Sequence, residues 1–379
     1  MATDKIKIAI FKPSNARTTN AFYSGQHPVF RYLQNNYNYE VTYFIDDKSV
    51  KFDAVTSRYI RKNRIKTFIL GGLRKSFKRY RYYWKIPYYE GLDFSKYDVI
   101  ITEGVHYSFL EYFKDIAHKV ILNDSISRNY MLQKSQVQYL NGHFSNSLAV
   151  VVNGKIPILY RLNEIKTKTT VIGHALEVEN IPFVKRENFN GKIISVGRLV
   201  PEKGFEYIIQ AIKILKKQYP EIELDIYGEG ILKGKLQRLI QSKGLTENVH
   251  LKKFLEYKQL LKRLANYDLF LSHPLETSYI AEAFLMANME AMASGMPVVT
   301  AKCGGVPYVV KDKAIIVNQK DIKGIVDAIM SLTNDPQKFT EYSVEGRKYV
   351  QREFSVKKIA GKWDVEIKRF LNCDSKHFG

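Results

Sequence analysis

Two glutamates in the C-terminal half of the chain, Glu282 and Glu290, have the spacing to bind two parts of one ligand. Seven residues separate them in the run 282–297, EAFLMANMEAMASGMP, which has a helical pattern. If the whole run is helical, the two carboxylates lie about 12 Å apart along its axis. One carboxylate then suits the hydroxyls of a sugar ring and the other those of a ribose, with a diphosphate between them. Glutamates on an amphipathic helix are usually solvated, but apolar flanks indicate a buried helix, where an unpaired charge is costly.

A second set of residues, from Gly197 to Gly204, has the pattern of an anion-binding loop. The loop follows an apolar run at residues 193–196 and precedes an amphipathic helical pattern. Gly197 permits close backbone approach, and the helix N-terminus offers N–H groups and a positive dipole end. Arg198 adds a bidentate guanidinium and Lys203 a mobile ammonium, which suits a diphosphate. Taken alone, these residues fit an ordinary strand–loop–helix connection with solvated charges equally well.

The elements that would position these residues are short β-branched runs that alternate with helical patterns. Such alternation is typical of βαβ units and parallel sheets. The runs are too many for one ordinary open sheet, so the sequence predicts an α/β fold of two doubly wound, Rossmann-like domains. The predicted strands are residues 6–11, 41–45, 99–102, 120–123, 148–152, 193–196, 224–227, 249–251, 269–272, 298–300 and 315–317.

A loop rich in Pro, Asn and Gly at residues 178–191 indicates the boundary between the two domains. The predicted domains are therefore residues 1–185 and residues 186–354. Residues 355–379 contain a final helical pattern, with apolar side chains along one side at Ile359, Trp363, Ile367 and Phe370.

The composition excludes several classes of protein. Hydrophobic residues make up 45% and charged residues 26% of the 379 positions, which is ordinary for a globular protein with a large core. The 2 cysteines, Cys303 and Cys373, exclude a disulfide framework and a cysteine-rich zinc site. The polar N-terminus does not resemble a secretory signal, and no apolar run reaches the roughly 18 residues of a membrane helix. We expect a cytoplasmic protein, or one peripheral to a membrane.

The two glutamates and the sequence around them resemble the family 4 glycosyltransferases, which are retaining enzymes of the GT-B fold. The family pattern is a glutamate, seven residues, Glu-Ala-Met-Ala-x-Gly-x-Pro-Val-Val, and then a Gly-Gly turn. This chain has Glu282, then EAMASGMPVV from Glu290 onward, and then Gly304-Gly305. The resemblance implies two Rossmann-like domains that face a central cleft, with a C-terminal helix that crosses back to the first domain.

Two further motifs extend the resemblance upstream. Gly197-Arg198 with Lys203-Gly204 is similar to the family's diphosphate loop, and YGEG at residues 227–230 is similar to the turn after its next strand. Three motifs in family order cover residues 193–317.

The resemblance implies a role for each matched residue at the site of a nucleotide-diphosphate sugar, with a UDP- or GDP-sugar most expected. Arg198 and Lys203 would neutralise the diphosphate and stabilise it as the leaving group, in place of a metal ion. Glu282 would bind the transferred sugar, and Glu290 the ribose hydroxyls. The other donor-binding positions would be Gly197, Gly228, Glu229, Gly230, Phe254, Leu255, Ala283, Phe284 and Leu285.

The chain departs from the family pattern next to Glu282. The family usually has Gly-Phe-Gly after this glutamate, whereas this chain has Ala283-Phe284-Leu285. The run SHPLETSY at residues 272–279 is also unusual. These departures indicate a donor sugar outside the common set, or a reduced activity.

The first domain has three candidate residues on the acceptor side. His106 follows the strand run 99–102, where a family histidine would contact substrate hydroxyls and contribute to catalysis; the alternative is a structural histidine. Asp124 stands at the next strand end, where relatives often have a histidine. Gly25 follows the first strand, where the family usually has a Gly-Gly pair.

The net charge is +21, from 59 Lys and Arg against 38 Asp and Glu. Residues 54–85 carry 11 Lys and Arg, no acid and several aromatic side chains. Such a segment suits an anionic membrane surface or an anionic acceptor. A solvated basic face fits the residues as well, and nucleic acid is not the expected partner.

The sequence thus predicts a retaining, hexosyltransferase-type glycosyltransferase that acts on a glycan, a lipid-linked glycan or a protein-linked glycan, with no resident cofactor or metal. One alternative is a sugar-nucleotide epimerase of the same fold. Another is a basic nucleic-acid-binding protein on a decayed transferase scaffold.

Overall fold

A computed structural model of the chain describes residues 4–12, 26–45, 56–63, 88–103, 110–124, 134–278 and 280–374. These residues form two compact units. The first comprises the described residues up to 173 together with 359–374, and the second comprises 174–358. The sequence placed the division after residue 185, but residues 174–185 belong to the second unit. Leu176 pairs with Ser355, and the Val184 amide donates to the Ser294 carbonyl over 3.1 Å.

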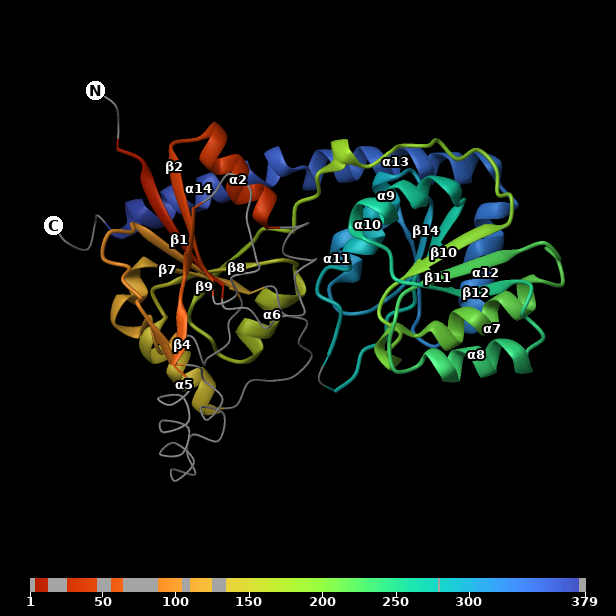
Figure 1. The fold of residues 1–379 in the computed structure, drawn as a ribbon, viewed down its shortest axis with the longest axis horizontal. Coiled ribbons are helices and arrows are strands. Elements are labelled where there is room, and N and C mark those ends of the chain that lie inside the picture. The colour runs from red at the N-terminus through yellow and green to blue at the C-terminus, as the bar shows by residue number, and fades with distance from the viewer. Residues whose placement is uncertain are drawn as a thin grey trace. The chain divides into compact units, whose positions relative to one another are not determined.

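The first unit is built on a seven-stranded parallel sheet (Figure 1). Its strand order is β3 (Thr56–Tyr59), β2 (Tyr39–Ile45), β1 (Ile6–Lys12), β6 (Val99–Glu103), β7 (Val120–Asp124), β8 (Leu148–Val151) and β9 (Lys168–Val171). A short antiparallel pair is formed by β4 (Arg61–Asn63) and β5 (Tyr88–Glu90). The helices of this unit include α2 (His27–Asn36), α5 (Lys134–His143) and α6 (Lys155–Leu162).

The C-terminal helix α14 (Val356–Asp374) completes the first unit from residue 359 onward, as the family resemblance implied. All four apolar residues on its predicted face are buried. The Trp363 ring packs against Phe30 of α2 with 5.3 Å between centroids. The Tyr39 hydroxyl of β2 donates to the Asp364 carboxylate over 2.8 Å. This helix is therefore part of the core of a unit that begins at the other end of the chain.

The second unit has a six-stranded parallel sheet. Its strand order is β12 (Val249–Lys252), β11 (Glu223–Tyr227), β10 (Lys192–Val196), β13 (Leu269–Leu271), β14 (Val298–Ala301) and β15 (Ile315–Val317). The helices α7 (Phe205–Leu215), α8 (Lys233–Ser242) and α12 (Ile322–Thr333) cover one face in Figure 1. The other face carries α9 (Tyr257–Arg263), α10 (Met286–Ala293) and α13 (Pro336–Phe354), and α11 (Val306–Val310) follows β14.

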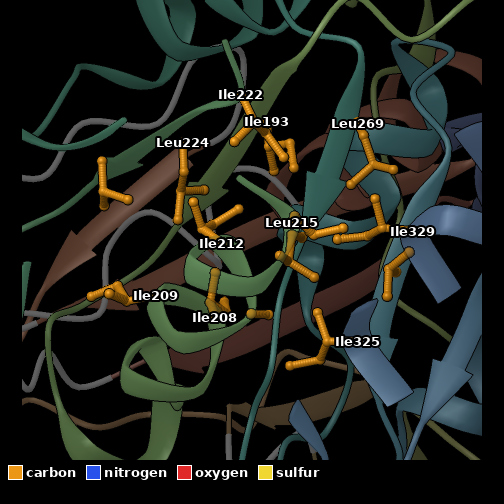
Figure 2. Close-up of a cluster of buried hydrophobic side chains, with 14 of the residues drawn as sticks. Ile193, Ile208, Ile209, Ile212, Leu215, Ile222, Leu224, Leu269, Ile325 and Ile329 are labelled. Atoms are coloured by element: carbon orange, nitrogen blue, oxygen red, sulfur yellow. The ribbon is translucent and has the colours of Figure 1, made fainter. Parts of the chain in front are cut away.

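The core of the second unit lies between the sheet and its first helical layer. Ile208, Ile212 and Leu215 recur at helical spacing on α7 and are almost fully buried. They meet Ile193 of β10 and Ile329 of α12 in one apolar cluster (Figure 2). This packing holds α7 against β10, and the predicted anion-binding loop connects the two.

All eleven predicted strands are present, with ends that differ by at most two residues. The sequence missed β3, β4, β5 and β9. Every residue of β3 is exposed, and β9 is exposed at both ends, so neither strand has the buried β-branched run of a central strand.

Candidate active site

The loops after β10 and β13 flank the point where the strand order of the second sheet reverses. Strands β10 and β13 are neighbours, although β11 and β12 come between them in the chain. In doubly wound sheets, ligands bind at such a point, outside the carboxyl ends of the strands. The loop 197–204 follows β10 and the segment 272–285 follows β13, so the two segments with candidate chemistry meet there.

An ion pair joins these two loops. The Lys203 ammonium contacts the Glu282 carboxylate across 79 positions of sequence. Both side chains are largely shielded from solvent, at 18% and 17% exposure, so the charges attract more strongly than a surface pair. The Arg198 guanidinium is 71% exposed and lies 3.4 Å from Glu202. The structure thus places a partly buried anion–cation pair beside an open guanidinium.

The backbone of the loop after β10 packs directly against the turn after β11. The Gly197 amide donates a hydrogen bond to the Tyr227 carbonyl over 3.0 Å, and the Leu199 amide donates one to the Glu229 carbonyl over 2.8 Å. A Cβ atom on Gly228 would lie 1.9 Å from the Gly197 carbonyl oxygen, so this position requires glycine. The GEG turn therefore supports the predicted diphosphate loop, while the Glu229 side chain points to solvent.

Helix α7 begins next to this loop with a glycine cap. Gly204 has φ +62°, and among the described residues no side chain caps the helix N-terminus. A Cβ atom on Gly204 would lie 2.1 Å from the His273 carbonyl oxygen. Glycine thus brings the loop after β13 against the helix N-terminus, whose N–H groups and dipole favour an anion.

Glu282 does not lie on a helix with Glu290, contrary to the prediction. Helix α10 begins at Met286, and Leu285 before it has φ +57°, in the left-handed region. A left-handed residue interrupts the helical path, so Glu282 belongs to the loop. Its carbonyl accepts the Gly305 N–H over 2.7 Å, which ties it to the Gly-Gly turn after β14.

Glu290 is a buried carboxylate in the middle of α10, with 6% exposure. Burial raises its pKa to about 7, and a hydrogen bond from the Tyr257 hydroxyl partly offsets that rise. Burial and the Glu290 charge together raise the pKa of Tyr257, so this hydroxyl remains a donor. Tyr257 could not be predicted as a partner of Glu290, because nothing in its spacing links the start of α9 to that residue.

The remaining donor-side positions divide into buried and exposed ones. Ala283 and Phe284 are buried, and the Phe284 ring packs between His174 at 5.1 Å and Phe354 at 5.4 Å. The side chains of these two residues are therefore largely inaccessible to a ligand. Phe254 is 52% exposed and Leu255 is half-buried in the loop before Tyr257.

Among the acceptor-side candidates, the structure describes Asp124. It ends β7, is fully buried, and accepts a hydrogen bond from the Tyr160 hydroxyl of α6 over 3.1 Å. Gly25 and His106 lie outside the described residues. The basic segment 54–85 is described at residues 56–63, and its aromatic residues from Phe68 to Trp84 lie outside the described residues.

The described residues include neither a candidate metal cluster nor a helix that could span a membrane. No group of three or more His, Cys, Asp or Glu side chains within them is arranged to hold a metal ion. Every helix in that part of the chain is too short or too polar to cross a membrane.

The solved structure of a glycosyltransferase from Rickettsia africae is similar in fold to this chain. It covers 97% of this chain and 99% of its own, with a TM-score of 0.75 at 16% identity. The chain has the GT-B fold. Within this GT-B chain, residues 178–349 match the model of the family Glycosyl transferases group 1.

Several curated proteins match in sequence. A "GDP-mannose-dependent alpha-(1-6)-phosphatidylinositol monomannoside mannosyltransferase" of Mycolicibacterium smegmatis is 31% identical over 160 residues, or 41% of this chain and 42% of its own. A "poly(ribitol-phosphate) alpha-N-acetylglucosaminyltransferase" of Staphylococcus aureus is 26% identical over 235 residues, or 61% of this chain and 46% of its own. The chain thus spans less than half the length of either relative.

Proposed function

We propose that this GT-B protein is a family 4 retaining glycosyltransferase of the hexosyltransferase type, which transfers a sugar from a nucleotide-diphosphate sugar to an acceptor hydroxyl. The observation that carries the proposal is the Lys203–Glu282 pair at the point where the strand order reverses. At this point a cation that could bind a diphosphate lies next to a carboxylate that could bind sugar hydroxyls. Glu290 supplies a second, buried carboxylate in the next helix.

Each group has a distinct task in the proposed complex. Lys203, Arg198 and the N-terminus of α7 neutralise the diphosphate without a metal ion. Glu282 accepts hydrogen bonds from the transferred sugar, and Glu290 accepts them from the ribose. Phe254 and Leu255 stand at the end of β12, on the side where the base would lie.

The reaction exchanges one bond at the anomeric carbon for another. The bond to the donor phosphate oxygen breaks, and the acceptor oxygen bonds to the same face of the sugar, so that the configuration is retained. The departing phosphate takes the acceptor proton. Lys203 and Arg198 stabilise the charge that develops on this phosphate, which is the main catalytic contribution that preorganised cations make.

The acceptor is proposed to be a glycan or a lipid-linked glycan. The Mycolicibacterium relative is named for a phosphatidylinositol mannoside, and this chain carries a net charge of +21. We propose that the chain acts in the cytoplasm or at a membrane surface, with its basic segment 54–85 toward anionic lipid. Sedimentation with vesicles that contain anionic lipid tests this point. If the protein does not bind these vesicles even at low salt, the proposed membrane contact is contradicted.

The donor site is tested by thermal shift and calorimetry with UDP, GDP, ADP and their sugars, with and without EDTA. A ligand that binds the native state at 100 times its Kd adds about 2.7 kcal/mol of stability. We expect one nucleotide series to raise the Tm of the wild type in EDTA, and Glu290→Gln to lose that shift. Glu247→Gln, an exposed carboxylate on the α8–β12 loop, is the matched control and should keep it.

Two outcomes would favour one of the alternative functions over the proposed one. Absence of any shift, with or without magnesium, would contradict the donor site, and salt-sensitive RNA or DNA binding would then favour the nucleic-acid alternative. Conversion of a bound donor into an isomer without acceptor would favour the epimerase. With a transferable donor, the anomeric coupling constant of the product reports retention or inversion.

A further inference from the structure

The segment between β13 and Glu282 has an unusual sequence and a dense set of polar contacts. Residues 272–276 run from the carboxyl end of β13 toward the loop of Glu282. His273, the second residue of this segment, is 1% exposed. A segment this buried needs its backbone groups satisfied locally, and the structure shows where they are satisfied.

One side of the segment contacts the diphosphate loop. The Leu275 amide donates to the Glu202 carbonyl over 2.9 Å, next to Lys203. The His273 carbonyl packs against Gly204, where a side chain would collide with it. The segment and the proposed diphosphate loop are therefore in direct backbone contact.

The other side contacts the loop after β15. The Glu276 amide donates to the Gln319 side-chain oxygen over 2.7 Å, and the Lys320 amide donates to His273 Nε2 over 2.8 Å. The Gln319 amide group in turn donates to the Lys302 carbonyl over 2.8 Å. These bonds hold Glu276 at a defined position rather than at a free loop tip.

The Glu276 carboxylate accepts the Gly304 N–H over 2.5 Å. The same Gly-Gly turn holds Glu282, since the Gly305 N–H donates to the Glu282 carbonyl over 2.7 Å. A Cβ atom on Gly304 would lie 2.1 Å from that carbonyl oxygen, so turn and loop are in backbone contact. Glu276 and Glu282 are thus both attached to one turn, through the N–H groups of its two successive glycines.

We propose that Glu276 is a positioning residue for the donor sugar, which fixes the Gly304–Gly305 turn and through it the place of Glu282 in front of Lys203. The inference rests on the proposed function. A hydrogen bond to a carboxylate is roughly twice as strong as one between neutral groups, so Glu276 restrains this turn more firmly than a neutral side chain. In the proposed complex Glu282 contacts the sugar and Glu290 contacts the ribose of the nucleotide. Because Glu276 positions Glu282, its loss should affect binding of the sugar and not of the nucleotide.

The test compares two affinities in each variant, measured by calorimetry: that for the nucleoside diphosphate and that for its sugar conjugate. Glu276→Ala removes the acceptor of the Gly304 N–H, and we expect about tenfold weaker binding of the nucleotide sugar. Binding of the nucleoside diphosphate should change less than about twofold. Glu276→Gln keeps an acceptor oxygen and should restore sugar binding to within about threefold of the wild type.

A second variant covers the case in which Glu276→Ala does not fold. Gln319→Ala removes the bond to the Glu276 amide and should weaken sugar-conjugate binding in the same selective way. Equal losses for both ligands would indicate a merely structural role and overturn the inference, as would unchanged affinities. If the wild type binds neither ligand, the proposed donor site itself fails, and the inference fails with it.

Discussion

The Arg186 guanidinium donates to the main-chain carbonyl of Ser294, the C-cap residue of the helix that carries Glu290. Arg186 is 5% exposed, and burial lowers its pKa to about 10. Its other acceptors are the carbonyls of Val184, Leu264 and Tyr267. One side chain thus joins the C-terminal end of α10 to two neighbouring segments, and a cation there also suits the negative end of the helix dipole.

Replacing this guanidinium by an ammonium should destabilise the protein. Arg186→Lys keeps a cation but loses the planar fork that serves several carbonyls, so buried acceptors lose their partner. We expect a loss of about 2–3 kcal/mol, measured as a lower midpoint in urea unfolding. Arg238→Lys on the exposed side of α8 is the matched control and should stay within about 0.5 kcal/mol. Equal effects of the two variants would contradict this role.

Glu290 should impose a pH-dependent cost on stability. Its pKa rises from an ordinary 4.5 to about 7 in the folded protein. Below pH 4.5 the carboxyl is protonated in both states, so it costs nothing. Between pH 4.5 and 7 the unfolded state ionises first and the folded protein loses stability, by up to about 3 kcal/mol at pH 7 and above.

The variant Glu290→Gln removes that ionisation. Its stability relative to the wild type should therefore increase as the pH is raised from 4.5 to 7 and stay level beyond, in chemical unfolding followed across pH. Glu247→Gln should show a flat difference over the same range. Parallel profiles for wild type and Glu290→Gln would show that Glu290 ionises normally.

Lys203→Ala should weaken binding of nucleoside diphosphates by about 10- to 100-fold. The estimate follows from a charged hydrogen bond worth about 1.5–3 kcal/mol, at 1.4 kcal/mol for each factor of ten. Calorimetry at low and high salt measures it. Lys213→Ala, at an exposed position of α7, should bind as the wild type does. Unchanged affinity in Lys203→Ala would mean that the diphosphate lies elsewhere.

Gly228→Ala should destabilise the second unit, because the new Cβ would lie 1.9 Å from the Gly197 carbonyl oxygen. The backbone of the proposed diphosphate loop would have to move, so both the Tm and the affinity for nucleotide should fall. Gly234→Ala in α8 meets nothing within 4 Å and should instead raise stability by up to about 1 kcal/mol. Opposite signs in thermal melts of the two variants are the expected result.

The central strands could be predicted from the sequence because each is buried on both faces. The run LDIY of β11, for example, is apolar enough to stand out from its surroundings. The edge strand β3 exposes every residue, so no buried apolar run marks it in the sequence, and it was missed.

The sequence allowed the residues of the candidate site to be predicted, but not the contacts between them. Motif spacing singled out Lys203, Glu282 and Glu290, yet the direct Lys203–Glu282 pair depends on how β10 and β13 become neighbours. The helix expected at Glu282 was wrong, because a run without Gly or Pro still turns left-handed at Leu285. Tertiary contacts with the Gly304–Gly305 turn outweigh local helix propensity there.

The place of Trp363 in the first unit has a consequence for how the chain folds during synthesis. The side chain packs on Phe30, yet all of residues 174–358 are made between the two. The second unit therefore leaves the ribosome complete while the first still lacks its last helix. The usual order, in which the N-terminal domain finishes first, is reversed in this chain. Until α14 emerges, the face of α2 that will receive Trp363 stays uncovered, and a nascent chain halted before residue 359 carries one finished unit and one unfinished one.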